Sequence, residues 1–204
     1  MIPDSLTGNT TRDQIIQAAI HLFAVKGYAQ TGMEEIAKEV GISKPAIYYH
    51  FESKEKLFEA LLQRVDEFHS GVFAELARMN LSLPDLIEEL IRRTIHEIRE
   101  LPDWIRMFHR LLSAGSELPA FVDMKVHHKQ DHETFRRLLA PALRDRRLRE
   151  GLSEEQFVDY VLTVIIGSMA HWYAMDELPD EEETPKLIRD SLMFGVIEKE
   201  EGRA

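Results

Sequence analysis

The chain has 204 residues, of which 44% are hydrophobic, a formal net charge of -11 and no cysteine. This apolar content is enough to bury a core, so a disordered tail protein is excluded. The lack of cysteine excludes disulfides, thiolate zinc sites and cysteine nucleophiles. The longest near-apolar run, Val161 to Met175, is shorter than the roughly 20 residues of a spanning helix. The start, MIPDSLTGNTTRDQ, lacks the features of a signal peptide. We therefore expect a cytoplasmic protein with no membrane partner.

The first two predicted helices lie before residue 42. Apolar residues from Ile15 to Phe23 follow the spacing of one helical face, and Gly27 is placed to end that helix. A second helix is predicted to begin at Thr31, with Glu34 three residues later in the arrangement of a capping box. Gly41 marks its end, which makes it a short helix of about two turns.

Two further helices follow a tight turn. Ser43 is placed to cap the third helix, with Pro45 in its first turn, and Ser53 is placed to cap a long fourth helix. Two short helices joined by such a turn predict a helix-turn-helix, whose second helix enters the major groove of DNA. Its inward residues are Ile47 and Phe51. The residues expected to face outward are Lys44, Ala46, Tyr48, Tyr49 and His50.

Charge is distributed unevenly along the chain. Residues 1–57 carry six basic and seven acidic residues, so ten of the eleven net negative charges belong to residues 58–204. DNA binding depends on the local field, on hydrogen-bond donors and on helix N-termini rather than on total charge. A nearly neutral tip with Lys44, Lys54 and Lys56 can therefore bind phosphate, with a modest dependence on salt.

The run from Arg12 to Phe58 resembles the N-terminal domain of TetR-type bacterial transcription regulators. The segments LFAVKGY, TGMEEIAKEVGIS, KPAIYYHF and SKEKLF occur in that order. The resemblance implies that double-stranded DNA is the partner and that repression is the mode of action. It implies that Tyr49 and His50 hold the phosphate backbone, that Lys54 adds a phosphate contact, and that Thr31 anchors the second helix to the backbone.

The same resemblance implies which residues lie nearest the base edges. These are Ser43, Lys44, Ala46 and Tyr48. The chain has Pro45-Ala46 where a glycine and a threonine often stand in the family, and this removes one backbone N–H and one hydroxyl from the predicted DNA interface.

The remaining sequence predicts helices throughout, so we expect an all-α fold. The expected domains are a three-helix DNA-binding domain over residues 1–57 and a larger helical domain for effector binding and dimerisation over residues 58–204. A helix over Phe157 to Met175 is apolar on nearly every side, so other helices must cover it on two faces. The resemblance implies that the last two helices pair with those of a second subunit, giving a homodimer and a pseudo-palindromic operator. The expected interface residues are Gly167, Ala170, Ala174, Leu192 and Val196.

The large helical body exceeds what DNA binding requires, and we expect a pocket for a small apolar or amphipathic effector. Its predicted lining is Trp104, Met107, Phe108, Phe121, Phe135, Met169 and Trp172. A core role for these residues is the alternative, because buried aromatic side chains mainly fill volume. A constitutive DNA-binding protein without a ligand therefore stays open as a second interpretation.

One segment, VHHKQDHETF, suggests a different class of protein. His128 and His132 are four residues apart on a predicted helix, with His127 and Asp131 nearby, and such a pair can share a metal. The segment lacks the glutamate of the HExxH pattern, so a solvated helix face is the favoured interpretation. A regulatory or adventitious metal is the main alternative, and a metal-dependent enzyme is less favoured. We expect no cofactor and no catalytic site.

Overall fold

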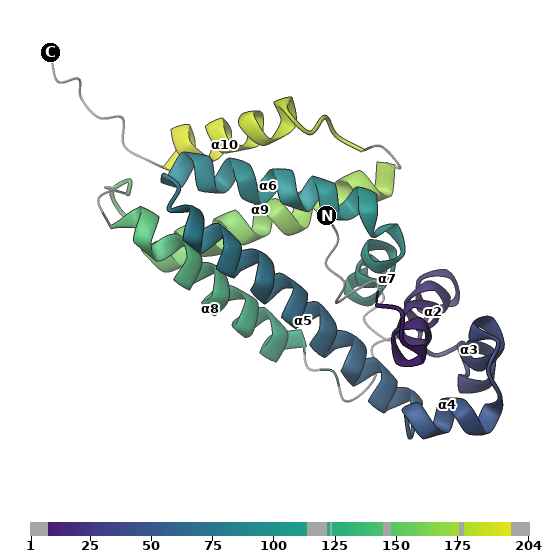
Figure 1. Ribbon diagram of the computed structural model, residues 1–204. Coiled ribbons are helices and arrows are strands. Elements are labelled where there is room, and N and C mark those ends of the chain that lie inside the picture. Colours follow the sequence, from purple (N-terminus) through teal and green to yellow (C-terminus); the bar gives the residue numbers. More distant parts are fainter. Residues whose placement is uncertain (1–7, 114–121, 123, 145–147, 176–177, 197–204) are drawn as a thin grey trace, which may run out of the picture. The chain divides into compact units, whose positions relative to one another are not determined.

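The computed structural model describes residues 8–113, 122, 124–144, 148–175 and 178–196. Its helices, shown in Figure 1, are α2 (Thr11–Lys26), α3 (Met33–Val40), α4 (Lys44–His50), α5 (Lys54–Met79), α6 (Leu83–Glu100), α7 (Pro102–Ser113), α8 (Met124–Leu143), α9 (Glu154–Met175) and α10 (Glu183–Val196). The described residues form no strand, and the predicted all-α class is confirmed. None of the described helices has the length and apolar character needed to cross a membrane.

Packing divides the chain into two compact units. The first unit consists of Met1–Val72 with Glu100–Val122, and the second consists of Phe73–Arg99 with Asp123–Ala204. The expected domains, 1–57 and 58–204, divide the chain by sequence instead. The two divisions differ because α7 packs against α2 and therefore belongs with the N-terminal helices.

Local capping sets the limits of α2. The backbone N–H of Asp13 donates to the hydroxyl of Thr10 at 3.2 Å, and the Asp13 carboxylate accepts from the Thr10 N–H at 3.1 Å. This reciprocal capping box satisfies two donors that the helix start would leave unpaired. The helix ends at Gly27, where φ is 90°, a conformation that favours glycine. Both the apolar face and the end of this helix agree with the sequence analysis.

The start of α3 differs from the prediction. Its N-cap is Gly32, and Thr31 is a buried residue whose hydroxyl donates to the carbonyl of Gly27 at 2.9 Å. The predicted Thr31–Glu34 capping box is wrong because the threonine hydroxyl is used by the preceding turn. The end is as predicted, since Gly41 is left-handed with φ of 77° and its N–H donates to the carbonyl of Lys38 at 3.1 Å.

A cluster of aromatic rings forms the core where α2 meets α5. The Phe23 ring lies 5.3 Å from that of Tyr28 and 5.8 Å from that of Phe58, and the Tyr28 and Phe58 rings meet edge to face at 5.1 Å. Burial raises the pKa of Tyr28 to about 12. Its phenol therefore stays protonated at neutral pH and donates to Glu55 at 3.5 Å. Such ring pairs add stability beyond the area that they bury.

A nearly buried ion pair joins the same two helices. The Arg64 guanidinium of α5 donates to the Asp13 carboxylate of α2. Hydrogen bonds from Thr10 and Arg64 lower the pKa of Asp13 to about 2, so the carboxylate is charged above that pH. The pair fixes the first turn of α2 to the middle of α5.

In the first unit, α7 also packs on α2. Arg110 donates to the carbonyl of Val25 at 2.9 Å, which satisfies an acceptor at the C-terminal end of α2. The His21 ring of α2 lies 2.7 Å from the Asp103 carboxylate of α7. Trp104 and Met107 are buried.

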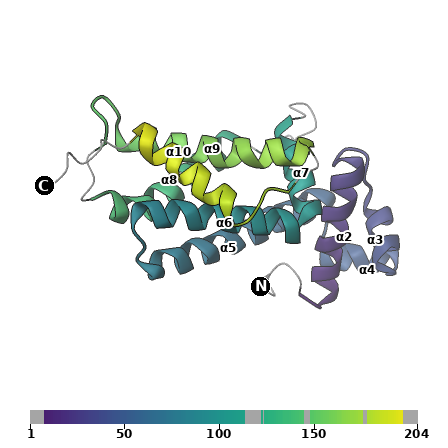
Figure 2. The same cartoon turned by 90° about the horizontal axis from the view of Figure 1, so that it is seen from above.

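The second unit is built on α6, α8, α9 and α10, with the last turns of α5. α6 buries one face along its whole length, from Leu83 to Ile98. α8 packs on α9, and the Phe135 ring of α8 meets that of Phe73 edge to face at 4.9 Å. Figures 1 and 2 both show α10 alongside α6 and α9. A capping box begins α9, because the Gln156 N–H donates to Ser153 at 3.1 Å and the Ser153 N–H to the Gln156 side chain at 2.9 Å.

Candidate nucleic-acid interface and apolar crevice

The short helix α4 is held by its caps and by two buried side chains. Ser43 is its N-cap, and the Ser43 hydroxyl accepts from the N–H of Ala46 at 3.3 Å. At the other end Phe51 is extended, with φ of -141°, and its N–H donates to the carbonyl of Ile47 at 2.9 Å. Ile47 and Phe51 are both buried, as predicted. The inward face of α4 therefore fixes the direction of its outward face.

That outward face presents two phenols to solvent. The exposed fraction is 88% for Tyr49 and 42% for Tyr48. The His50 ring is half-buried and meets the Tyr49 ring edge to face at 5.5 Å. Pro45 is exposed in the first turn and Ala46 is half-buried. Exposed phenol hydroxyls and a half-buried imidazole on one short helix are suited to hydrogen bonds with phosphate oxygens or base edges.

Lysines around this helix are engaged with acidic partners. The Lys44 ammonium donates to the Glu34 carboxylate of α3 at 2.5 Å, and Lys56 donates to Glu59 at 2.6 Å. Lys26 pairs with Glu35. The hydrogen bond with Glu34 raises the pKa of Lys44, so this side chain stays charged at neutral pH. The sequence alone does not reveal the Glu34–Lys44 pair, because the spacing of Glu34 from Thr31 predicts a capping box instead.

Lys54 takes a different position from the other lysines. Its ammonium donates to the carbonyls of Tyr28 at 2.9 Å and Thr31 at 3.0 Å, and it lies 4.2 Å from the centre of the Tyr28 ring. It thereby connects the start of α5 to the turn before α3. Thr31 itself is buried, with its hydroxyl satisfied by backbone carbonyls. The structure thus gives Thr31 and Lys54 positioning contacts inside the protein.

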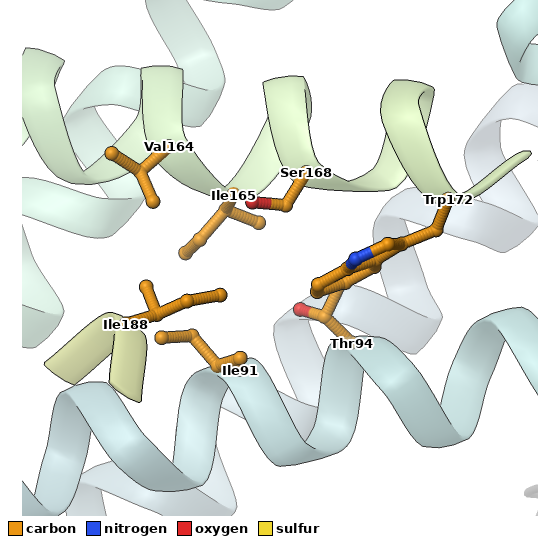
Figure 3. Close-up of a pocket in the computed structure, with 7 residues that line it drawn as sticks. All are labelled: Ile91, Thr94, Val164, Ile165, Ser168, Trp172 and Ile188. Atoms are coloured by element: carbon orange, nitrogen blue, oxygen red, sulfur yellow. The ribbon is translucent and has the colours of Figure 1, made fainter. Parts of the chain in front are cut away.

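The second unit contains a narrow apolar crevice whose described side chains leave no enclosed space for a water-sized molecule. Figure 3 shows that its walls come from three helices, with Ile91 and Thr94 on α6, Ile188 on α10, and the rest on α9. The α9 residues are Val164, Ile165, Ser168 and Trp172. A pocket for a drug-sized ligand usually has about 300–1,000 Å³. The crevice as it stands is therefore too small for such a ligand and would have to widen.

The predicted pocket residues are dispersed, and of those described only Trp172 lines this crevice. Phe135 packs on Phe73, and Met169 is half-buried on α9. The remaining members lie on α7 of the first unit, where Trp104 and Met107 are buried and Phe108 is half-buried, or outside the described residues, as Phe121 does. The sequence carries no signal that Thr94, Ser168 and Ile188 lie together, because they are far apart in the chain.

The histidine segment lies on α8. The His132 ring nitrogen is 3.2 Å from the carboxylate of Asp159 on α9. The side chains of His127, His128 and Asp131 lie outside the described part of the structure. Among the described residues, no three potential metal ligands gather.

Comparison with known proteins agrees with this geometry. Residues 15–61 match the family described as "Bacterial regulatory proteins, tetR family". The resemblance drawn from the sequence is confirmed for this helix-turn-helix domain, which matches the N-terminal domain of the TetR family of bacterial regulators. The family and the matched relatives are regulators of transcription and not enzymes.

Two curated relatives match parts of the chain. The HTH-type transcriptional activator FasR of Mycolicibacterium smegmatis is 50% identical over 62 residues, which cover 30% of this chain and 28% of FasR. The negative regulator IcaR of the biofilm operon icaADBC in Staphylococcus aureus is 34% identical over 107 residues, covering 52% of this chain and 56% of IcaR. The matches thus span about a quarter and about half the length of these relatives.

A solved structure is similar over most of the chain. The transcriptional regulator FadR from Bacillus subtilis, in complex with stearoyl-CoA, has a TM-score of 0.72 at 19% identity, covering 89% of this chain and 97% of that chain. At this identity the likeness supports the fold alone.

Proposed function

We propose that the protein is a sequence-specific DNA-binding regulator, most simply a repressor, that leaves a pseudo-palindromic operator when a small apolar or amphipathic effector binds. The observation that carries the DNA-binding part is the outward face of α4, with Tyr49 exposed at 88% on a helix whose opposite face is buried. A tyrosine side chain this exposed contributes little to the core, and its hydroxyl is suited to a phosphate contact.

Within this proposal, the site residues take two roles. Ser43, Lys44, Tyr48, Tyr49 and His50 contact DNA, while Pro45 and Ala46 let the start of α4 approach it closely. Thr31 and Lys54 act as positioning residues, because their polar groups already bond to carbonyls at 2.9 and 3.0 Å inside the first unit. The surface that meets DNA is then formed by α4 and the exposed start of α3.

Selection of oligonucleotides from a random duplex pool tests this function. We expect enrichment of a two-fold symmetric sequence. The variant Tyr49→Phe should weaken binding to all duplexes alike, by roughly 1 kcal/mol for one phosphate hydrogen bond. If no sequence is enriched by the wild-type protein, the proposed function is wrong.

Dimerisation is proposed through α9 and α10. Leu187 and Phe194 of α10 are exposed at 68% and 72%, and they lie seven residues apart, on one face of the helix. A Cβ added to Gly167 of α9 would meet no described atom within 4 Å, so packing within the chain does not require this glycine. Exposed apolar faces of this kind typically mark an interface with another protein.

The expected interface residues need one correction. Leu192 is 1% exposed and belongs to the core of its own unit. Gly167 is exposed and Ala170 half-buried, in agreement with a place at the interface, and the side chains of Ala174 and Val196 lie outside the described residues. We therefore propose that α10 meets a second copy through Leu187 and Phe194.

Sedimentation can test the dimer. Phe194→Glu should yield monomers with weakened operator binding, because a two-fold protein binds two half-sites together. The same change at Leu178, which is exposed outside the helices, is the control and should leave the dimer intact. Dimers that persist in Phe194→Glu would remove this face from the proposal.

An effector is proposed to enter the crevice between α6, α9 and α10. Its walls are apolar, and the Thr94 hydroxyl already donates to the carbonyl of Leu90 at 2.9 Å, so this chemistry is suited to an acyl chain or the apolar part of a similar amphipathic molecule. FadR, which is similar in fold, holds stearoyl-CoA. The crevice helix α6 ends at Glu100 and is followed after Leu101 by α7, which packs on α2. Widening the crevice would therefore displace a helix that is joined to the DNA-binding unit.

A constitutive DNA-binding regulator is the second candidate, favoured by the small volume of the crevice. A ligand changes DNA affinity only if it binds the two states differently, and this coupling is typically about 1–3 kcal/mol. Titration with stearoyl-CoA and other amphipathic compounds, with operator release as the readout, separates the two candidates. Tight binding without any release would favour the constitutive one.

A further inference from the structure

The ion pair between Glu34 and Lys44 stands at the proposed DNA surface rather than away from it. Glu34 lies in the first turn of α3, and Lys44 is the first residue of α4. Their side chains remain 69% and 62% exposed although the ammonium and the carboxylate are only 2.5 Å apart. The structure therefore presents a positive donor and a negative acceptor side by side, at the start of the helix that is expected to read bases.

Such a pair is poorly suited to a phosphate. A carboxylate beside the ammonium repels a phosphate oxygen and cancels most of the attraction that a lone lysine would give. The major-groove edge of a G·C pair is different, because guanine offers the acceptors O6 and N7 and cytosine offers the N4 amino donor beside them. Lysine is a donor to guanine, and glutamate accepts from cytosine N4. The two side chains thus match the two halves of one base-pair edge.

The helix α4 itself supplies no carboxylate for this readout. KPAIYYH contains no carboxylate, and Pro45 and Ala46 supply no side-chain hydrogen bond. The Ser43 hydroxyl already accepts from the Ala46 N–H. A carboxylate for a cytosine amino group must therefore come from outside α4, and Glu34 is the acidic residue that already contacts Lys44. Exposed ion pairs contribute little to stability, so turning both groups toward a base pair costs little.

We propose that Glu34 and Lys44 act together as a specificity-determining pair that reads a G·C base pair in each half-site, with Lys44 on guanine and Glu34 on the cytosine amino group. This inference rests on the proposed DNA-binding function. It predicts that the acidic residue, which opposes binding to phosphate in general, adds preference for one sequence.

The test begins with duplex selection by the wild-type protein, Glu34→Ala, Lys44→Ala and the control Glu35→Ala. Glu35 follows Glu34 and pairs with Lys26 of α2, so its removal changes the charge equally without touching Lys44. Thermal unfolding by circular dichroism verifies that each variant is folded. The enriched half-site then supplies a duplex for titration, together with copies in which one G·C pair at a time is replaced by A·T.

For the wild type, one replacement in each half-site should weaken binding by about 5- to 150-fold, the range of a good base contact. In both Glu34→Ala and Lys44→Ala, this replacement should weaken binding much less, with the penalty, that is the fold loss of affinity, approaching one. Glu34→Ala should also bind random duplex more tightly than the wild type does. Glu35→Ala should keep the wild-type penalty. These results together support the pair.

Other outcomes overturn the inference. If Glu34→Ala binds every duplex more tightly but keeps each wild-type penalty, Glu34 merely competes with DNA for Lys44. If Glu35→Ala loses the same penalty, the effect is one of charge and not of contact. Both results leave the proposed function intact, whereas failure of the wild type to enrich any sequence rejects the function itself.

Discussion

The outward face of α4 and the crevice of the second unit represent two different kinds of site. The α4 face is complete in the free protein, because caps at Ser43 and Phe51 and the buried Ile47 fix the direction of its exposed phenols. The crevice has apolar walls on three helices and no room for a water-sized molecule, so it would have to widen to hold the effector that we propose. A regulator can use these two kinds of site together. Ligand binding in the crevice would then change the position of the α4 face without changing the groups on that face.

The largest expected effect comes from comparing substitutions on the buried and the exposed face of α4. Ile47→Ala removes a fully buried side chain and should destabilise the first unit by about 2–4 kcal/mol. Tyr49→Ala on the opposite face should leave stability within about 0.5 kcal/mol, since the side chain is exposed, yet weaken DNA binding most strongly among changes that keep the fold. Thermal unfolding and gel shifts on the same samples measure both quantities. Equal stability losses would mean that Tyr49 packs inside the protein.

A second change fills the crevice. Ser168→Phe places a ring between α6, α9 and α10 and should cost about 1–3 kcal/mol if the walls cannot move. Operator affinity should change little, while the response to an amphipathic ligand is lost. His96→Phe, on the exposed side of α6, is the control and should keep the response.

Fluorescence gives a direct readout for this change. The chain has two tryptophans, so a Trp104→Phe background leaves Trp172 of the crevice as the single reporter. Ligand should alter its emission in the background protein and in the His96→Phe control. A full response in Ser168→Phe would place the effector elsewhere.

The sequence predicted the helices of the first unit well because their signals are local. Ser43 and Ala46, or Gly41 and Lys38, are three residues apart, so the cap and the turn could be recognised from spacing. The prediction failed at Thr31, where spacing alone could not show that the hydroxyl bonds back to Gly27. Local patterns identify which groups can cap a helix, but not which of two acceptors a hydroxyl uses.

The crevice could not be predicted in this way. Its walls join Thr94, Ser168 and Ile188, which are far apart in the chain, and none carries a charge or a motif. The pairs that fix the first unit are equally remote, as Arg64 and Asp13 are 51 residues apart. The sequence showed apolar helices in the right order, whereas their mutual register depends on packing that no short window contains.

An intermediate effect is expected from the Arg64–Asp13 pair. The pKa of Asp13 is lowered from 3.8 to about 2, so the folded protein binds this proton more weakly than the unfolded chain does. Its contribution to stability is therefore complete above pH 3.8, on the order of 1–2 kcal/mol, and is lost as the pH falls through about 2. Asp13→Asn keeps a capping oxygen but removes the charge. Its loss of stability relative to the wild type, called its deficit below, should therefore shrink as the pH falls from 3.8 to about 2.

Urea unfolding of both proteins at several pH values measures this deficit. Glu133→Gln is the control, because hydrogen bonds from Arg136 and Arg137 also lower the pKa of Glu133 to about 2, but on an exposed part of α8. Solvent screens that pair, so the control should lose much less stability. A deficit of Asp13→Asn that is independent of pH would show that the charge is not what stabilises the contact.

The smallest expected effect concerns Lys54. It shows whether the Lys54 ammonium stabilises the first unit through internal hydrogen bonds or contacts a DNA phosphate. If the ammonium holds the turn at Tyr28 and Thr31, Lys54→Met should reduce stability by about 1 kcal/mol and weaken DNA binding without altering its dependence on salt. If it contacts a phosphate instead, the slope of log K against log salt should fall by about 0.9. Lys38→Met, on the exposed side of α3, matches the loss of charge and should leave stability unchanged. A change in salt slope for Lys54→Met with full stability would transfer Lys54 to the DNA contacts, and the rigid surface of α4 would then extend to the start of α5.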